Sequence, residues 1–137
     1  MKKNDKAQLH LLESIIAKMP GHVYWKDKDG NYLGCNEGQA KALGLKSREE
    51  IFNRAPYQSL SKKEASMLKE IDAKVLATGE AATAEEPGIR TDGSTGTFLT
   101  KKTPLYSEEG EVVGLLGISF DITEKIKQEQ KIKELYQ

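Results

Sequence analysis

Few residues in this sequence are suited to catalysis. It contains one cysteine, Cys35, and two histidines, His10 and His22. A single cysteine cannot form an internal disulfide, and no Cys/His cluster is available to bind zinc. The sequence shows no nucleophile, base and orienting group in a recognisable arrangement, and no glycine-rich loop that would hold phosphate before a helix. It therefore predicts a non-catalytic protein, and any kinase or cyclase domain would lie outside these 137 residues.

The three residues named above are interpreted as structural. His10 lies in an apolar helical stripe and His22 at the start of a predicted strand, where an exposed or partly buried imidazole is common. Cys35 ends a predicted strand immediately before Asn36, and we interpret it as a small core residue and not a reactive thiol.

Length and charge exclude several classes of protein. A chain of 137 residues fits one domain with a modest core. The 21 basic and 21 acidic residues cancel, so no overall field favours nucleic acid or an anionic membrane. No apolar run approaches the roughly 20 residues of a membrane span, and the N-terminus MKKNDKAQ lacks the apolar core of a signal peptide. The cytoplasm is the expected compartment.

The segment 114–123, GLLGISFDIT, is the one around which the other elements are arranged. Strand alternation over 112–120 places apolar or small residues on both faces, which is typical of a central strand covered on both sides. Asp121 has the spacing to cap the following helix, with Glu124 three residues later as in a capping box. A displacement of this strand would therefore be transmitted directly to the helix.

The remaining pattern predicts an α+β domain. A helix over 7–19 ends at Pro20-Gly21, and a hairpin is expected from strands 22–27 and 31–35. Asn36, Ser47 and Ser61 are predicted N-caps of three helices, the last ending at Gly79. Strands follow over 80–90, where Pro87-Gly88 interrupts the pattern and indicates an edge position or a bulge, and then over 97–105 and 112–120. A charged helix over 123–137 is predicted to be a solvated connector.

Four segments in this order resemble a PAS domain, the sensor module of bacterial signalling proteins. They are WKDKDGNYLGCN at 25–36, KEIDAKVLATG at 69–79, RTDGS at 90–94 and KTPLYSEEGEVVGLLGISFDITE at 102–124. The resemblance implies a five-stranded antiparallel sheet in the order 2-1-5-4-3, with short helices on one face. It also implies an N-terminal amphipathic cap helix over 1–20, a PAS core over 21–122 and a C-terminal signalling helix over 123–137.

The resemblance also implies a cavity between the sheet and the middle helices. In the strand register of the family, the ligand-binding side chains of this sequence would be Tyr24, Lys26, Leu68, Ile71, Val75, Phe98, Thr100, Lys102, Leu115 and Ser119. A buried lysine is costly unless an anion meets it. We therefore expect Lys26 and Lys102 to reach the rim of the cavity, and the sharper alternative is an anionic ligand. A register slip of one residue would invert this assignment.

The opposite face of the sheet is expected to meet the N-terminal helix. That helix carries Leu9, Leu12 and Ile16 on one stripe, which could lie on the sheet or pair with a second copy of the chain. The sheet residues expected to meet it are Val23, Trp25, Leu99, Leu116, Ile118 and Phe120. A homodimer through the N-terminal and C-terminal helices is the predicted assembly.

No cofactor or metal is predicted. Haem needs an axial ligand, usually histidine, on the cavity-facing helix, and that helix has none. The flavin-photoreceptor subset of the family uses a cysteine in an Asn-Cys-Arg context in the middle helices, whereas Cys35 lies at the end of the second strand.

Two functions are open on the sequence alone. In the first, the chain is a cytoplasmic PAS sensor that binds a small molecule or relays a signal through Asp121, Ile122 and Thr123 to an output such as a two-component histidine kinase. In the second, it is a ligand-free PAS module that serves in homodimerisation or protein docking. Neither reading identifies a stimulus.

Overall fold

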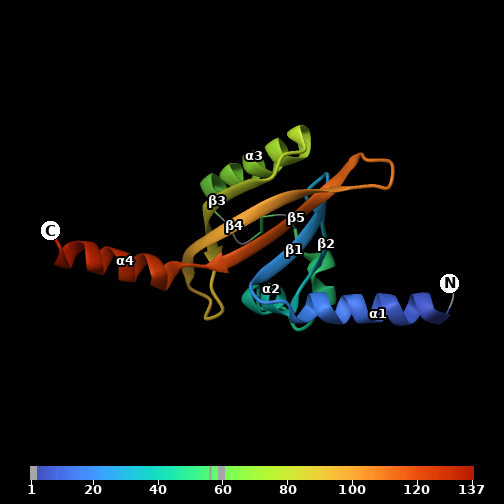
Figure 1. Ribbon diagram of the computed structural model, residues 1–137, viewed down its shortest axis with the longest axis horizontal. Helices are drawn as coiled ribbons and strands as arrows, with labels where there is room; N and C mark the ends of the chain where they lie inside the picture. The colour runs from blue at the N-terminus through green and yellow to red at the C-terminus, as the bar shows by residue number, and fades with distance from the viewer. Residues whose placement is uncertain (1–2, 56, 59–60) are drawn as a thin grey trace.

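Five strands form one antiparallel sheet in the order β2-β1-β5-β4-β3 in the computed structural model, which describes residues 3–55, 57–58 and 61–137 (Figure 1). The strands are β1 (His22–Asp27), β2 (Tyr32–Cys35), β3 (Ala82–Ile89), β4 (Thr95–Tyr106) and β5 (Val112–Asp121). The helices are α1 (Lys3–Lys18), α2 (Glu37–Ala42), the 3-10 helix η1 (Arg48–Asn53), α3 (Lys62–Thr78) and α4 (Thr123–Leu135). The α+β class and the predicted strand order are confirmed.

Strand β5 occupies the centre of the sheet, as its two apolar faces indicated. It pairs with β1 on one side and with β4 on the other, in each case antiparallel. β3 pairs with β4 alone and is an edge strand, as expected for a segment that contains Pro87, which has no N–H to donate. The sheet is therefore built around the strand that leads into α4.

Capping residues fix the boundaries of the helices. Asn36 Oδ1 accepts a hydrogen bond from Gln39 N at the start of α2, and Ser61 Oγ accepts one from Glu64 N at the start of α3. Gly79 ends α3 with φ +70°, a left-handed conformation that favours glycine. Ser47 occupies the N-cap position of η1, as predicted, but its side chain makes no capping hydrogen bond.

The middle helices cover one face of the sheet. α3 lies over β3 and β4, while α2 lies near β1, and the core sits between these helices and the sheet (Figure 1). Its fully buried side chains are Cys35, Asn36, Ile51, Val75, Thr100 and Leu115. Two of these six are polar, so the interior is hydrogen-bonded as well as apolar.

The prediction that the N-terminal helix covers the opposite face of the sheet is wrong. α1 extends away from the sheet, and Leu9 and Leu12 are 47% and 48% exposed (Figure 1). The chain turns at Gly21, whose φ is +80°, and Asn36 Nδ2 donates to the carbonyl oxygens of Met19 and Gly21. The C-terminal end of α1 therefore meets the start of α2, where Lys18 pairs with Glu37. Of the predicted stripe only Ile16 is half-buried, in a groove that it lines together with Trp25 of the sheet.

The outer face of the sheet is consequently only partly covered. Leu33, Leu99 and Phe120 are each more than 40% exposed, while Trp25, Leu116 and Ile118 are half-buried. An apolar face of this kind on a small protein is typical of an interaction surface.

Candidate functional site

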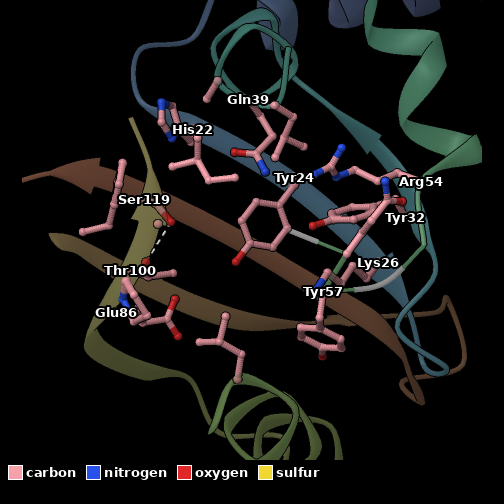
Figure 2. A pocket seen from close by; sticks show the side chains of 18 of the residues that line it. His22, Tyr24, Lys26, Tyr32, Gln39, Arg54, Tyr57, Glu86, Thr100 and Ser119 are labelled. Atoms are coloured by element: carbon pink, nitrogen blue, oxygen red, sulfur yellow. Dashed lines mark hydrogen bonds between the residues drawn. The ribbon is translucent and has the colours of Figure 1, made fainter. Parts of the chain in front are cut away.

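A cavity of about 100 Å³ lies between the inner face of the sheet and the helices (Figure 2). Seven of the ten residues proposed from the family register line it: Tyr24, Lys26, Leu68, Phe98, Thr100, Lys102 and Ser119. The other three do not. Val75 and Leu115 are buried in the core, and Ile71 is half-buried on α3.

The register of the sheet explains why these strand residues share one face. Tyr24 lies opposite Gly117 on β5, and Thr100 lies opposite Ser119. Gly117 is required beneath the ring of Tyr24, because a Cβ at this position would lie 2.3 Å from the ring carbon Cζ. The hydroxyls of Thr100 and Ser119 are 2.7 Å apart and share a hydrogen bond (Figure 2).

Both lysines are buried and ion-paired, so the expectation that they reach the rim of the cavity is wrong. Lys102 Nζ lies 2.7 Å from Asp72 Oδ1 and 2.9 Å from Glu86 Oε2. Lys26 Nζ lies 3.4 Å from Asp72 Oδ2. Each of the four side chains is 6% exposed or less. The anions that meet the lysines are thus carboxylates of the protein itself, on α3 and β3.

Lys26 is also surrounded by aromatic rings. Its Nζ lies 5.4 Å, 5.0 Å and 4.3 Å from the ring centroids of Tyr24, Tyr32 and Tyr57, respectively. Such cation–π contacts stabilise a desolvated ammonium group. Burial lowers the pKa of Lys26, and the charge of Asp72 acts against that shift.

Tyr57 joins this cluster from the segment before α3. Its hydroxyl donates to Asp72 Oδ2, and its φ of +59° is uncommon for a residue other than glycine. Burial and the nearby carboxylate raise the pKa of Tyr57, so its phenol is protonated at neutral pH. Asp72 therefore receives hydrogen bonds from three separate elements.

Sequence reasoning missed several residues of the site: Tyr32, Gln39, Arg54, Tyr57, Asp72 and Glu86. A signal existed for two of them. Asp72 lies four residues after Leu68, on the same helical face, and Glu86 pairs with the inward-facing Phe98. Because Pro87-Gly88 interrupts the strand pattern, the sequence alone did not show that Glu86 pairs with Phe98.

His22 and Cys35 have the structural environments expected of them. His22 packs against Phe98 with ring centroids 5.1 Å apart, and burial lowers its pKa despite the charge of Asp121. Cys35 is 1% exposed and packs with Tyr24, Ala40 and Ile51. Burial raises the pKa of its thiol to about 11, which disfavours the reactive thiolate.

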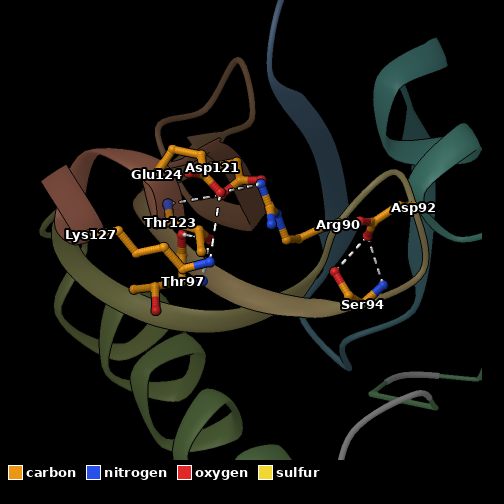
Figure 3. A network of polar contacts seen from close by, with 8 residues as sticks. All are labelled: Arg90, Asp92, Ser94, Thr97, Asp121, Thr123, Glu124 and Lys127. Carbon is orange, nitrogen blue, oxygen red and sulfur yellow. Dashed lines mark hydrogen bonds and ion pairs between the residues drawn. The ribbon is translucent and has the colours of Figure 1, made fainter.

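The junction between the sheet and α4 forms a second polar site (Figure 3). Arg90, just beyond β3, places Nε 2.8 Å from Asp121 Oδ2 and its Nη2 3.6 Å from Glu124 Oε1. Thr97 N donates to Thr123 Oγ1 over 3.0 Å, and Thr123 N donates to Asp121 Oδ1 over 3.0 Å. The start of α4 is thus bonded to β4, to β5 and to Arg90, the residue that follows β3.

Asp121 is not the N-cap predicted from the capping-box spacing. It ends β5, and the N-cap position is Ile122, which has no side chain able to accept a hydrogen bond. Glu124 is instead ion-paired with Arg90. Apart from this junction α4 is solvated, and none of its residues is buried (Figure 1).

The described part of the chain contains no group of three His, Cys, Asp or Glu side chains arranged to hold a metal ion. None of the helices in residues 3–55, 57–58 and 61–137 has the length and apolar character needed to cross a lipid bilayer.

A five-stranded antiparallel sheet that encloses a polar cavity with short helices defines the class of fold, and the family comparison agrees. The model described as PAS fold matches residues 17–127. The chain therefore belongs to the PAS family.

The chain is similar to parts of longer regulatory proteins. It is 30% identical over 118 residues to the aerobic respiration control sensor protein ArcB of Escherichia coli, covering 86% of this chain and 15% of ArcB. It is 31% identical over 108 residues to the methanogenesis regulatory histidine kinase FilI of Methanothrix harundinacea, covering 74% of this chain and 11% of FilI.

One solved structure with the same fold is a Vibrio cholerae VqmA–ligand–DNA complex. The two chains superpose with a TM-score of 0.73 at 23% identity, over 84% of this chain and 51% of that one. At this identity the likeness shows the shared fold.

Proposed function

We propose that this chain is a cytoplasmic sensory domain whose cavity binds a small molecule and whose α4 helix relays the change to an output domain. The relatives that carry a similar segment include a sensor protein and a histidine kinase. An output of the histidine-kinase type, outside these residues, is therefore the favoured partner.

The main support for this proposal is the cavity. A core that serves only for stability needs no open space and few charges, whereas here buried polar and charged side chains converge around a volume of about 100 Å³. Buried ionic groups contribute little net stability compared with apolar packing. Their presence at a cavity is typical of a binding site.

The relay is proposed to pass through Asp121, Ile122 and Thr123. These residues join central strand β5 directly to α4, and Ile122 N donates to Thr97 O over 2.9 Å. A ligand that repositions Ser119 would act on the same strand two residues before Asp121. α4 has few other contacts that would resist such a movement.

Native mass spectrometry of the purified chain tests ligand binding. We expect a stoichiometric mass above that of the polypeptide, which disappears under denaturing conditions. The variant Ser119→Leu fills the cavity and should abolish the additional mass. Ile118→Leu, a change on the outer face of the same strand, should keep it. The polypeptide mass alone, under all conditions, would contradict the sensory proposal and favour the second candidate.

The second candidate is a homodimerisation module. It is favoured by the exposed stripe of Leu9 and Leu12 on α1, together with the partly uncovered outer face of the sheet. In this proposal a second copy covers both surfaces. Size-exclusion chromatography with light scattering should report a dimer for the unaltered chain and a monomer for Leu9→Glu/Leu12→Glu.

A charge-matched control is available on the same helix. Lys6→Glu alters an exposed polar position of α1, changes the net charge by the same two units as the two leucine substitutions together, and should leave the dimer intact. A dimer that survives the two leucine substitutions would exclude the stripe of α1 as the interface.

A further inference from the structure

Glu86 has the least satisfied charge in the cavity. Its Oε2 lies 2.9 Å from Lys102 Nζ, yet no group among the described residues donates to this oxygen with hydrogen-bond geometry. Asp72, by contrast, accepts from Lys26, Lys102 and Tyr57. A buried carboxylate oxygen without a donor carries a desolvation penalty that a ligand donor would relieve.

Glu86 and a pair of hydroxyls lie on the same side of the cavity. Figure 2 shows the carboxylate beside Thr100, with Ser119 just beyond. The hydrogen bond between Thr100 Oγ1 and Ser119 Oγ uses one of their two hydroxyl protons. The second proton can point to an acceptor on a ligand. The protein thus presents an acceptor and a donor at neighbouring positions.

The charges of the buried cluster are already balanced. Lys26 and Lys102 supply two positive charges, and Asp72 and Glu86 supply two negative charges. A charged ligand would add an uncompensated charge to this low-dielectric region, which is costly. The tyrosine rings that would attract a cation already surround Lys26, and the lysines that would attract an anion are paired.

Two charged or titratable side chains elsewhere in the cavity do not alter this balance. Burial lowers the pKa of His22, which keeps its imidazole neutral at pH 7. Arg54 is half-buried beside Tyr32, on the far side of the cavity from Glu86 in Figure 2. Water therefore screens its charge more effectively than those of the buried cluster.

The volume restricts the size of the ligand. A cavity of about 150 Å³ accommodates benzene, so the roughly 100 Å³ here fits a five-membered ring or a molecule of similar size. Apolar contacts would come from Leu43, Leu68 and Phe98, which line the same space.

We propose that the cavity selects a compact, uncharged ligand that donates an N–H or O–H group to Glu86 Oε2 and accepts a hydrogen bond from the Thr100–Ser119 pair. This ligand class rests on the proposed ligand-binding function and refines it. It replaces the anionic ligand considered from the sequence.

Four probes of similar or smaller size test the ligand class on the unaltered chain. Pyrazole is neutral at pH 7 and carries an N–H donor beside a nitrogen acceptor. Isoxazole has the same ring size with oxygen in place of N–H, and acetate and methylammonium supply the two charges. Titrations followed by NMR shifts of Gly88, Thr100 and Ser119 amides should show pyrazole binding at least about tenfold more tightly than the other three, as expected for a hydrogen bond to a charged group.

A matched pair of variants tests the role of Glu86. Glu86→Gln removes the charge and should weaken pyrazole binding by about tenfold or more. Glu85→Gln makes the same change at the adjacent, exposed residue of β3 and should leave binding unchanged. Since the probe series needs no variant, it remains informative even if Glu86→Gln does not fold.

The outcomes separate the two proposals. Equal binding of pyrazole and isoxazole, or tighter binding of acetate or methylammonium, would overturn the ligand class while leaving a ligand-binding cavity. Equal affinity of both glutamine variants would overturn the assignment to Glu86. No shift with any probe would overturn the ligand class together with the small-molecule function.

Discussion

Asp72 offers a direct test of the buried ionic cluster, because it is the shared partner of Lys26 and Lys102. The substitution Asp72→Asn keeps the shape of the side chain but leaves two buried ammonium groups with Glu86 as their nearest anion. We expect it to lower the free energy of unfolding by about 3–5 kcal/mol at pH 7, the usual cost of breaking a buried ion pair.

Proton release sets an upper limit to this loss. Without Asp72, Lys26 can become neutral in the folded state, since burial already lowers its pKa. Removing a proton at pH 7 from a group with an ordinary pKa of 10.5 spans about 3.5 pH units, or about 4.8 kcal/mol. At pH 9 the same limit is about 2 kcal/mol.

The loss should therefore depend on pH. In the variant, a lysine that is neutral when folded and protonated when unfolded makes stability rise with pH up to about 10.5. The difference between Asp72→Asn and the unaltered chain should shrink from pH 7 to pH 9. Urea unfolding, followed through circular dichroism and the single Trp25, measures it at each pH.

Two further variants complete the experiment. Glu70→Gln alters an exposed residue of α3 and should change stability by less than about 0.5 kcal/mol. Lys26→Met/Asp72→Asn leaves one buried positive charge, on Lys102, opposite one buried negative charge, on Glu86. The free energy of unfolding of this double variant should be about 1–3 kcal/mol higher than that of Asp72→Asn. A loss below about 1 kcal/mol for Asp72→Asn, or one that is equal at pH 7 and pH 9, would refute the reasoning.

Three other predictions follow from the junction and the core. Burial alone would raise the pKa of Asp121, but hydrogen bonds from Thr123 and Arg90 outweigh it and lower the pKa to about 2. The lowered pKa contributes on the order of 1 kcal/mol of stability after screening by solvent, which is present above about pH 3.8 and is lost as the pH falls toward 2. Asp121→Asn should therefore flatten that part of the acid unfolding curve, and an unchanged curve would contradict the prediction. Gly96→Ala would place a Cβ 2.4 Å from Thr123 Oγ1. We therefore expect the free energy of unfolding to fall by about 1–3 kcal/mol and amide hydrogen exchange at the start of α4 to become faster. Unaltered exchange there would argue against this contact. Burial raises the pKa of Cys35 to about 11, so a smaller fraction of its thiol is ionised at pH 8. Its reaction with DTNB at pH 8 should be about 100-fold slower than that of a thiol with pKa 9.0. A rate like that of a free thiol would disprove its burial.

The sheet was predictable because its signals are local. Alternation in 112–120 identified the central strand, and Pro87 indicated the edge strand. With the register of the PAS family, the same alternation placed Tyr24 and Thr100 toward the space where the cavity lies. Each of these inferences needs only neighbouring residues or one pairing partner.

The errors arose where distant residues decide the outcome. An apolar stripe with Leu9 and Leu12 fits a sheet surface or a second helix equally well, and the bonds of Asn36 at the turn direct α1 away from the sheet. The burial of Lys26 depends on Asp72, 46 residues later in the chain. Spacing along the chain does not reveal such a partner.

The edge strand β3 links the two polar sites described above. Glu86 contacts the cavity, and Arg90, four residues later, holds the start of α4 through Asp121 and Glu124. An edge strand is hydrogen-bonded to one neighbour only, so sliding or bending it breaks fewer backbone bonds than moving a central strand. One of the two edge strands of the sheet thus connects the wall of the cavity to the start of α4.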